Sequence, residues 1–507
     1  MSNTIIIGIL LHVEWQYMTH KIDKFIVAKS LIWTFLEKGG AQGIQLIISI
    51  VLARLLAPAE YGIIALVTIF LQLAAAFIQT GFGTALIQKQ EVNHVDFSTV
   101  FYLSLFIAVI CYIILFLSAP FIASFYNQDI LVQVLRVLGL SCFSTAINCP
   151  QYAYISKYMK FKSRFYSSTI ANFISGIVGI ILAYRGLGVW ALVVQQLLYG
   201  YITFTILFFT VRWHPTLAFS FEKMKYIVKF SYKLLISTLL STVIGGLNSL
   251  IIGKFYTGTQ LGVYSKGQHF PNFISSNLIG AIQTVSLPTF SAFNTNLEQQ
   301  KKYIKRFISL STYILMPCMF GLAAIASPLV QVLLSDQWIG CIPYLQLGCI
   351  SWAFLSINSS SISSINAMGR SDIYLKLEII KNIITIAVLV FTAPLGVMAI
   401  AIGQTSVYLL TVFIDSFPNK SLFNYPLSEE ILDFLPPLLL SIFMALIIYP
   451  IQFLDIPNVI ILFFQIISGV VIYIILSVLF KLDAYVYIIT FVREIRRKKN
   501  LPSKKVI

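Results

Sequence analysis

The sequence has few charged residues and fewer acids than bases. Only 11% of the 507 residues are charged, whereas 58% are hydrophobic and the mean hydropathy is +0.86. Soluble domains carry about 25% charged residues, so an aqueous fold would need an implausibly large core. A bilayer buries such a surface directly, and we therefore predict a membrane protein.

Cysteine and the signatures of catalysis are also scarce. The six cysteines fall in or beside apolar segments, and none forms a C-x-x-C motif, which favours small core residues over disulfides or metal ligands. The five histidines are scattered, and the chain has no H-E-x-x-H, P-loop or nucleophile-elbow motif. No loop is long enough to form a soluble catalytic domain. We expect no catalytic residue, metal or cofactor, and the chain is not predicted to be an enzyme. The six cysteines are Cys111, Cys142, Cys149, Cys318, Cys341 and Cys349.

Long apolar runs, in contrast, recur along the whole chain. A spanning helix needs about 20 mostly apolar residues, and about fourteen runs of this kind are present. The sequence therefore predicts an all-α polytopic membrane protein, with Pro120 ending the third helix and an extension of that helix to Phe125 as the alternative. The expected helices are 32–56, 61–82, 98–118, 130–152, 167–184, 188–210, 234–255, 262–288, 308–328, 341–365, 373–392, 396–414, 432–453 and 457–480.

The positive charges indicate the orientation in the membrane. Most of the 35 Lys and Arg residues fall in alternate loops and in the C-terminal tail, as expected for cytoplasmic loops. Both termini are then cytoplasmic, with residues 1–29 as an N-terminal cytoplasmic segment. The net charge of +16 reports this topology and does not indicate nucleic-acid binding. Met18, which opens the basic stretch MTHKIDKF, is a second possible start.

Two pairs of segments indicate an internal repeat. LGVWALVVQQ (Leu187 to Gln196) matches LGVMAIAIGQ (Leu395 to Gln404), and LARLLAPAEYG (Leu52 to Gly62) aligns with IGKFYTGTQLG (Ile252 to Gly262). Chance similarity between apolar stretches is the alternative, but the offsets of 208 and 200 are close. We predict parallel six-helix lobes at 30–215 and 216–415, then two helices and a basic tail at 416–507. Such repeats suit a transporter with its substrate site between the halves.

Polar residues form stripes on corresponding helices of the two halves. Their spacing of three and four residues places them on one helix face. Packing of helices by small and polar residues is the alternative explanation for the uncharged members. The stripes comprise Lys38, Gln42, Gln45 and Ser49; Thr68, Gln72, Gln79 and Gly83; Ser241, Gly245 and Asn248; and Lys266, His269, Asn277, Gly280 and Thr284.

Four cations fall in or near these stripes: Lys38, Arg54, Lys254 and Lys266. A charge in the membrane costs several kcal/mol and normally faces water or a partner. The alternative is that Lys38, Arg54 and Lys254 reach the membrane interfaces through their long side chains. With few acids nearby, a cavity lined by these cations would attract anions, and a diphosphate is a natural candidate.

The segments WTFLEKGGAQGIQLIISIVLARLLAPAEYG, GFGTALIQK, LGVWALV and GKFYTGTQLGVYSKG together resemble the polysaccharide transporters of the multidrug/oligosaccharidyl-lipid/polysaccharide flippase superfamily. The resemblance runs from about Lys29 to Lys420. It implies fourteen helices in two lobes that form a V. It also implies flipping of an undecaprenyl-diphosphate-linked oligosaccharide across the bacterial inner membrane by alternating access.

The resemblance also implies roles for the polar residues. Lys38, Arg54, Lys254 and Lys266 would bind the diphosphate, and Gln42, Gln45, Gln79, Asn248 and Asn277 would contact the glycan. The partners implied are the lipid-linked oligosaccharide, membrane lipid, and the polymerase and export machinery of the same pathway.

Two other functions stay open. A multidrug antiporter of the same superfamily would need a buried carboxylate, and acids are scarce within the predicted helices. A membrane polysaccharide polymerase or glycosyltransferase would need a large outside loop or an acidic cluster beside a cytoplasmic domain.

Overall fold

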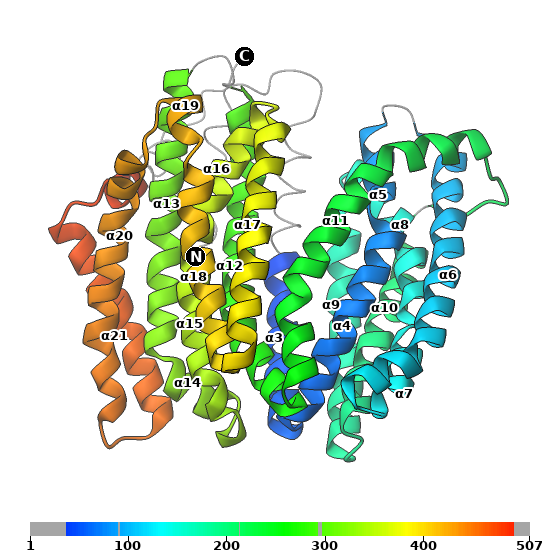
Figure 1. Cartoon of the computed structure of the whole chain (residues 1–507), viewed down its shortest axis with the longest axis horizontal. Helices are drawn as coiled ribbons and strands as arrows, with labels where there is room; N and C mark the ends of the chain where they lie inside the picture. Colours follow the sequence, from blue (N-terminus) through cyan, green and yellow to red (C-terminus); the bar gives the residue numbers. More distant parts are fainter. Residues whose placement is uncertain (1–36, 90–91, 212, 293–296, 491–507) are drawn as a thin grey trace, which may run out of the picture. The chain divides into compact units, whose positions relative to one another are not determined.

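The computed structural model describes residues 37–89, 92–211, 213–292 and 297–490. Within these ranges the chain is helical and contains no strand (Figure 1). Met18, the N-terminal segment 1–29 and the end of the tail lie outside the described residues. The side chains of Lys38 and Thr284 lie outside them as well.

The described chain divides into two compact units between Ser265 and Lys266, inside one helix. We call residues up to Ser265 the first unit and residues from Lys266 the second unit. The lobe boundary that the sequence suggests, at residues 215 and 216, stays a prediction.

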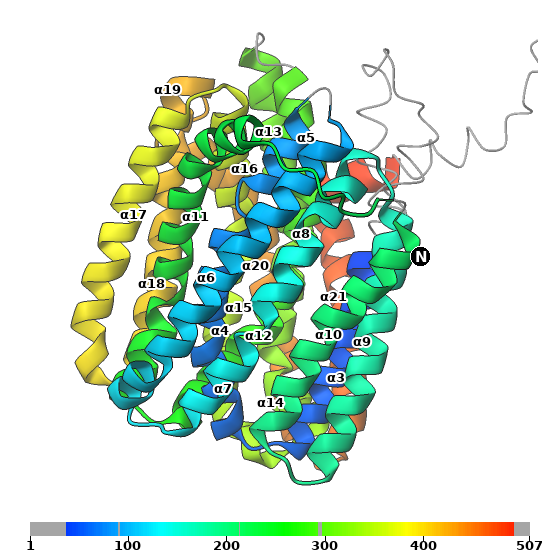
Figure 2. The same cartoon turned by 90° about the vertical axis from the view of Figure 1, so that its right-hand side faces the viewer.

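The first unit consists of one π-helical turn followed by α-helices. They are η1 (Glu37–Ala41), α3 (Gln42–Leu55), α4 (Pro58–Gln79), α5 (Phe82–Gln88), α6 (His94–Tyr126), α7 (Ile130–Leu138), α8 (Ser141–Lys157), α9 (Phe161–Tyr184), α10 (Val189–Thr210), α11 (Phe221–Phe255) and the first turns of α12 (Gly258–Ala292). Helices α4, α6 and α8 pack against one another, α3 and α10 pack on α9, and α11 packs on α4 and α6 (Figure 2).

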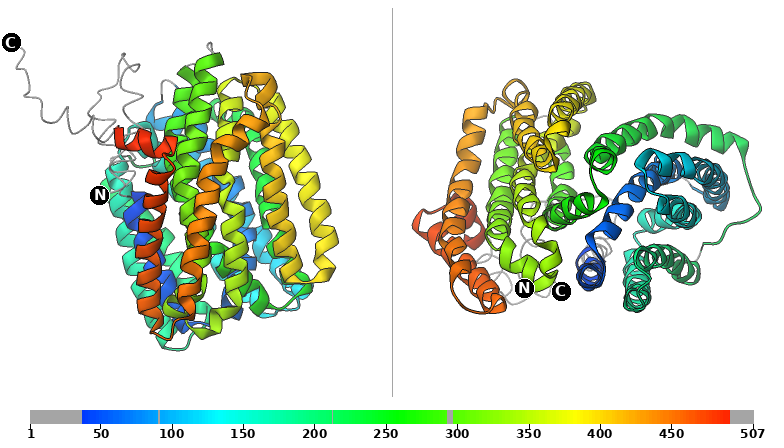
Figure 3. Two further views of the ribbon diagram at one scale, coloured as in Figure 1. Left: turned by 90° about the vertical axis from the view of Figure 1, so that its left-hand side faces the viewer. Right: turned by 60° about the horizontal axis from the view of Figure 1, so that its bottom comes forward.

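The second unit begins with the rest of α12. It continues with α13 (Leu297–Ala324), α14 (Ala326–Leu333), η2 (Asp336–Cys341), α15 (Ile342–Ala353), α16 (Leu355–Ala367), α17 (Ser371–Thr392), η3 (Ala393–Leu395), α18 (Val397–Ser416), α19 (Asn419–Phe423), α20 (Leu427–Ile448), η4 (Tyr449–Phe453) and α21 (Asn458–Leu479). Helix α13 packs against α15, α16 and α20, and α20 packs on α21 at the edge of the unit (Figure 3, left).

Within the described residues, each of the fourteen predicted apolar runs overlaps a helix or a pair of short helices. In the described chain, eleven helices are long and apolar enough to cross a membrane. Helices α3, α12 and α17 overlap predicted runs but do not meet that criterion. Helix α17 does not meet it because its apolar stretch contains three charged residues, Lys376, Glu378 and Lys381. The chain is therefore a multi-pass helical membrane protein, and the count of fourteen stays a prediction.

Two details differ from the predicted helices. Pro120 does not end a helix, because α6 continues through it to Tyr126. In an apolar surrounding, a chain that leaves the helix would expose backbone polar groups without partners, which costs more than the one hydrogen bond that proline removes. The predicted run 130–152 is broken after Leu138 into α7 and α8.

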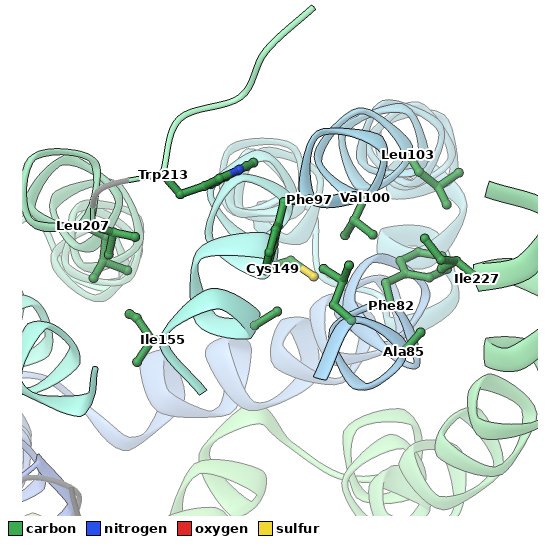
Figure 4. Close-up of a cluster of buried hydrophobic side chains, with 13 residues drawn as sticks. Phe82, Ala85, Phe97, Val100, Leu103, Cys149, Ile155, Leu207, Trp213 and Ile227 are labelled. Atoms are coloured by element: carbon green, nitrogen blue, oxygen red, sulfur yellow. The ribbon is translucent and has the colours of Figure 1, made fainter. Parts of the chain in front are cut away.

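The short helix α5, which the sequence did not indicate as a separate element, belongs to the core of the first unit (Figure 4). Its Phe82 and Leu86 are buried with Phe97 of α6 and Trp213, which follows α10. The ring centroids of Phe97 and Trp213 are 5.6 Å apart. The chain after α4 therefore packs back into the core of the first unit.

Helices α4 and α12 begin with the same type of N-terminal cap. The Ala57 amide donates to Oε2 of Glu60 at 2.8 Å. The Thr257 amide donates to Oε1 of Gln260 at 3.1 Å, and the Gln260 amide donates back to the Thr257 hydroxyl at 3.2 Å. A carboxylate or amide at the third helical position satisfies a free backbone donor in this way. The alignment of Glu60 with Gln260 in the predicted repeat thus has a structural counterpart.

Candidate functional site

Helix α3 has one face for packing and another for polar side chains. Ile48, Leu52 and Ala53 are buried, and the Asn172 side-chain amide of α9 donates to the carbonyl of Ala41 at 3.1 Å, next to the start of α3. Gln45, by contrast, is exposed. Of the predicted polar stripe, Gln45 therefore points away from the core of the first unit, whereas Gln42 and Ser49 are half-buried.

Helix α4 also exposes amide side chains. Gln79 is exposed near its end, and Gln72 is exposed two turns earlier. Gln42, at the start of α3, is half-buried. An exposed amide in an otherwise apolar spanning helix has no partner in lipid, so it favours a water-filled surface or a bound polar ligand.

The two asparagines predicted to bind glycan already have contacts within the protein. The amide nitrogen of Asn248 in α11 donates to the Tyr264 hydroxyl at 3.4 Å, and the amide nitrogen of Asn277 in α12 donates to the carbonyl of Phe273 at 2.7 Å. Both side chains are half-buried. Their glycan contacts stay a prediction, and the structure gives each a packing role of its own.

Two of the predicted cations lie at helix C-termini. Arg54 is exposed in the last turn of α3, and Lys254 occupies the last turn of α11. The Lys254 ammonium donates to the Phe125 carbonyl at 2.5 Å and lies 4.2 Å from the centre of the Phe125 ring. Cations at a helix C-terminus offset the negative end of its dipole. Lys254 therefore has a packing contact with the end of α6, and both its predicted diphosphate contact and its alternative place at the membrane interface stay predictions.

Lys266, in the second unit, is only 4% exposed. Its ammonium lies 5.8 Å from the centre of the Trp338 ring in η2, and the next residue, Gly267, contacts Cys341 and Tyr344 at the start of α15. Because Arg54 and Lys254 belong to the first unit and Lys266 to the second, neither unit assembles the four-cation site from its own described residues. The diphosphate site therefore stays a prediction.

A buried ion cluster in the second unit was missed by the sequence reasoning. Asp415 of α18 is 1% exposed and lies 3.1 Å from the Lys381 ammonium of α17, which also lies 2.6 Å from Glu378. Lys381 falls within the predicted helix 373–392, and in α17 it is half-buried. The signal in the sequence was the spacing of Glu378 and Lys381 by three residues within an apolar run.

The cysteines and possible metal ligands can also be placed. All six cysteines are free; five are buried as predicted, whereas Cys318 is exposed. In the part of the chain that the structure describes, no three His, Cys, Asp or Glu side chains are grouped closely enough to hold a metal ion.

Comparison with known proteins agrees with this architecture. Residues 51–343, more than half of the chain, match the model of the family described as "Polysaccharide biosynthesis protein". The chain is 24% identical over 376 residues to the succinoglycan biosynthesis transport protein ExoT of Rhizobium meliloti, covering 74% of this chain and 76% of ExoT. It is 23% identical over 385 residues to the lipopolysaccharide biosynthesis protein WzxC of Escherichia coli, covering 74% and 76%.

Solved structures share the fold. The lipid II flippase MurJ in an inward closed conformation has a TM-score of 0.73 at 15% identity, over 89% of this chain and 98% of MurJ. An inward-facing multidrug resistance transporter of the MATE family, of the MOP superfamily, has a TM-score of 0.58 at 15% identity, over 83% of this chain and 98% of that transporter. The chain belongs to the family described as "Polysaccharide biosynthesis protein", and it shares its fold with MurJ and the MATE transporter.

Proposed function

We propose that this protein flips an undecaprenyl-diphosphate-linked oligosaccharide from the cytoplasmic to the outer leaflet of the bacterial inner membrane, for synthesis of a cell-surface polysaccharide. Relatives named as transport and biosynthesis proteins for succinoglycan and lipopolysaccharide support the polysaccharide part. A fold shared with a lipid II flippase supports movement of a lipid-linked substrate. The basic loops support cytoplasmic termini.

The observation that carries the proposal is the exposure of glutamine side chains on α3 and α4. Gln45 and Gln79 are exposed in otherwise apolar helices, which also expose the apolar Ile47 and Phe77. Sugar hydroxyls both donate and accept hydrogen bonds, as the carboxamide group does. A glycan passing along these helices would replace the water that hydrates the glutamines, while the polyprenyl chain stays in lipid.

In this proposal the diphosphate moves with the glycan, and Lys38, Arg54, Lys254 and Lys266 are its candidate counter-charges. Arg54 is the exposed member among the described side chains. Lys266 would have to leave its position beside Trp338 to reach an anion. The rocking of two lobes by alternating access, and contact with a polymerase and export machinery, belong to the same proposal.

A multidrug antiporter is the second candidate, because MATE transporters share the fold. Export of a cationic drug needs a carboxylate that can bind it. Two of the three buried acids of the described chain, Asp96 and Asp415, already pair with lysines, at 2.7 Å to Lys89 and 3.1 Å to Lys381. The third, Glu430, is 0% exposed and hydrogen-bonded to Ser416 and Asn419, so it does not face a ligand in this structure. The scarcity of accessible carboxylates favours the anionic lipid-linked substrate.

Deletion of the gene tests the proposal in cells. The lipid-linked oligosaccharide should accumulate in the cytoplasmic leaflet, and the surface polysaccharide should be lost. If the precursor itself disappears, the protein is an enzyme of its synthesis and the proposal is wrong.

A residue-level prediction concerns the exposed glutamines. Gln45→Leu and Gln79→Leu should each lower export, by about fivefold if one hydrogen bond of about 1 kcal/mol is lost in the transport step. Surface polysaccharide per cell, normalised to protein abundance in the membrane, measures the effect. Ile47→Leu, at a 63% exposed apolar position of the same helix, is the matched control and should export normally. If both glutamine variants export normally, the prediction that these glutamines contact the glycan is wrong.

A further inference from the structure

One buried acid in the second unit has no cationic partner. Three acidic side chains are buried in the described chain: Asp96, Asp415 and Glu430. Asp96 pairs with Lys89 at 2.7 Å and Asp415 with Lys381 at 3.1 Å. Glu430 is 0% exposed, and no lysine, arginine or histidine of the described chain lies within ion-pair distance of it. Its charge state is therefore not set by an ion pair.

The partners of Glu430 are neutral. The Ser416 hydroxyl, at the end of α18, donates to Oε1 at 2.7 Å. The side-chain amide of Asn419 in α19 donates to Oε2 at 3.2 Å. Glu430 itself lies in the first turn of α20, where the helix dipole favours negative charge. The ionised carboxylate thus has donors but no counter-ion.

The same asparagine carries an unsatisfied acceptor. Asn419 is 0% exposed, its amide nitrogen also donates to the Ser361 hydroxyl at 2.9 Å, and its amide oxygen has no hydrogen-bond donor among the described residues. A buried acceptor without a donor is costly. If Glu430 is protonated, its hydroxyl becomes a hydrogen-bond donor next to this amide group. The neutral form of the acid can therefore also form a hydrogen bond here.

The charged groups around Glu430 are already paired with one another. Two lysines of α13 form ion pairs with acids of α20 that lie close to Glu430 in the sequence. A lysine of α17 forms an ion pair with an acid of α18. Tyr425, between α19 and α20, donates its hydroxyl to Asp433 at 2.7 Å. Burial and this hydrogen bond raise the pKa of Tyr425 well above its usual range, so it stays neutral. The ion pairs are Lys301 with Glu429 at 2.8 Å, Lys305 with Asp433 at 3.1 Å and Lys381 with Asp415 at 3.1 Å, and Lys420 of α19 is exposed.

Polar pairs extend from Glu430 along the contact between α18 and the serine-rich α15–α16 region. Asn358 donates to Thr411 at 2.8 Å, and Ser351 bonds to Thr405 at 3.0 Å. From Thr405 to Ser416 the helix rises by about 16 Å, at 1.5 Å per residue. This row of buried hydroxyl and amide groups gives the acid a polar surrounding inside the second unit.

We propose that Glu430 is a proton-binding carboxyl group of the second unit, and that its protonation is coupled to the transport cycle. A buried carboxylate without a counter-ion is destabilised in its charged form, whereas the Ser416 and Asn419 donors and the helix N-terminus stabilise that form. The two effects oppose each other, which keeps both protonation states accessible. The coupling to transport rests on the proposed function, but the proton binding does not.

Infrared difference spectroscopy on the purified full-length protein in nanodiscs tests the proton binding. Between about pH 8 and about pH 5, the unmodified protein should gain the C=O band of a buried carboxylic acid, because this window lies around ordinary Glu pKa values and their upward shifts. Glu430→Gln should lose the part of the band that Glu430 contributes and keep any part that comes from the other buried acids, Asp96 and Asp415. Glu429→Gln, one residue away but ion-paired and partly exposed, should keep the full band. An undiminished band in Glu430→Gln, or no band in the unmodified protein, would overturn the assignment.

Ser416→Ala provides a second test that does not depend on the Glu430 variant being folded. Removing a donor to the carboxylate disfavours its charged form, so the midpoint of the band should move upward by about half to one pH unit. An unchanged midpoint would show that the titrating acid is not Glu430.

Reconstituted transport tests the coupling. An imposed pH gradient should change the rate of the unmodified protein and of Glu429→Gln, but leave the rate of Glu430→Gln unchanged. If Glu430→Gln still responds to the gradient, the coupling is wrong and the flippase proposal stands. If the unmodified protein moves no lipid-linked oligosaccharide, the flippase proposal fails while the infrared result stands on its own.

Discussion

Replacing Gly62 or Gly262 with alanine should destabilise the protein by about 3 kcal/mol or more, near the upper end of overpacking substitutions. A Cβ atom on Gly62 would lie 1.9 Å from the backbone oxygen of Gly258, and one on Gly262 would lie 1.8 Å from the backbone oxygen of Pro58. Backbone atoms cannot rotate away as a flexible side chain can. The N-terminal turns of α4 and α12 would have to separate, and the core of the first unit would open at that end.

Gly43→Ala and Gly245→Ala are matched controls, because a Cβ at either position meets nothing within 4 Å. Both lie in helices, where alanine is favoured over glycine by about 0.5–1 kcal/mol. The fraction of protein that stays monodisperse on size-exclusion chromatography after heating measures the difference. The close contact is refuted if Gly62→Ala and Gly262→Ala keep the same monodisperse fraction after heating as the two controls.

The close contact between α4 and α12 occurs twice, between positions that are 200 residues apart in the sequence. Pro58 and Gly258 each begin a helix, and each faces the glycine four residues into the other. The sequence alignment pairs the same positions. This local symmetry supports the predicted repeat and gives its two glycines a physical reason.

Lys381→Met should have the second large effect. It leaves Asp415 buried without a cation, and breaking a buried ion pair from one side costs about 3–5 kcal/mol. Glu378, on the same helix as Lys381, adds repulsion once the lysine charge is gone. We expect low abundance in the membrane and an early loss of monodispersity on heating.

The double variant Lys381→Met with Asp415→Leu shows whether the loss of stability comes from the unpaired charge or from lost packing. Replacing both partners with apolar residues removes the unpaired charge and should recover most of the lost stability. Lys376→Met, at an exposed position of the same helix, should behave like the unmodified protein. A double variant no more stable than Lys381→Met would contradict this explanation.

The helices were largely predictable, because the length of an apolar run is a local property of the chain. The exceptions have physical causes. Pro120 failed to end α6 because a membrane penalises leaving a helix more than losing one bond. The division of the run 130–152 into α7 and α8 has no comparably strong signal in its sequence.

The site was less predictable than the helices. Gln45 and Gln79 lie on exposed surfaces, in keeping with the polar stripes. Lys254, however, contacts the end of α6, and Lys266 is buried beside Trp338. These contacts could not be predicted from the sequence, because the partners lie far along the chain. The same holds for Lys381 and Asp415, which are 34 residues apart. Charge alone cannot distinguish a cation that binds ligand from one that packs.

Reconstitution tests the flippase proposal most directly. The purified protein would be placed in liposomes that carry an undecaprenyl-diphosphate-linked oligosaccharide, with a glycosidase or lectin added outside after the outer-leaflet pool has been consumed. We predict that the inner-leaflet oligosaccharide becomes accessible in the presence of the protein, and much more slowly with Gln45→Leu. Accessibility no faster than in protein-free liposomes, from protein shown to be folded, would contradict the proposal.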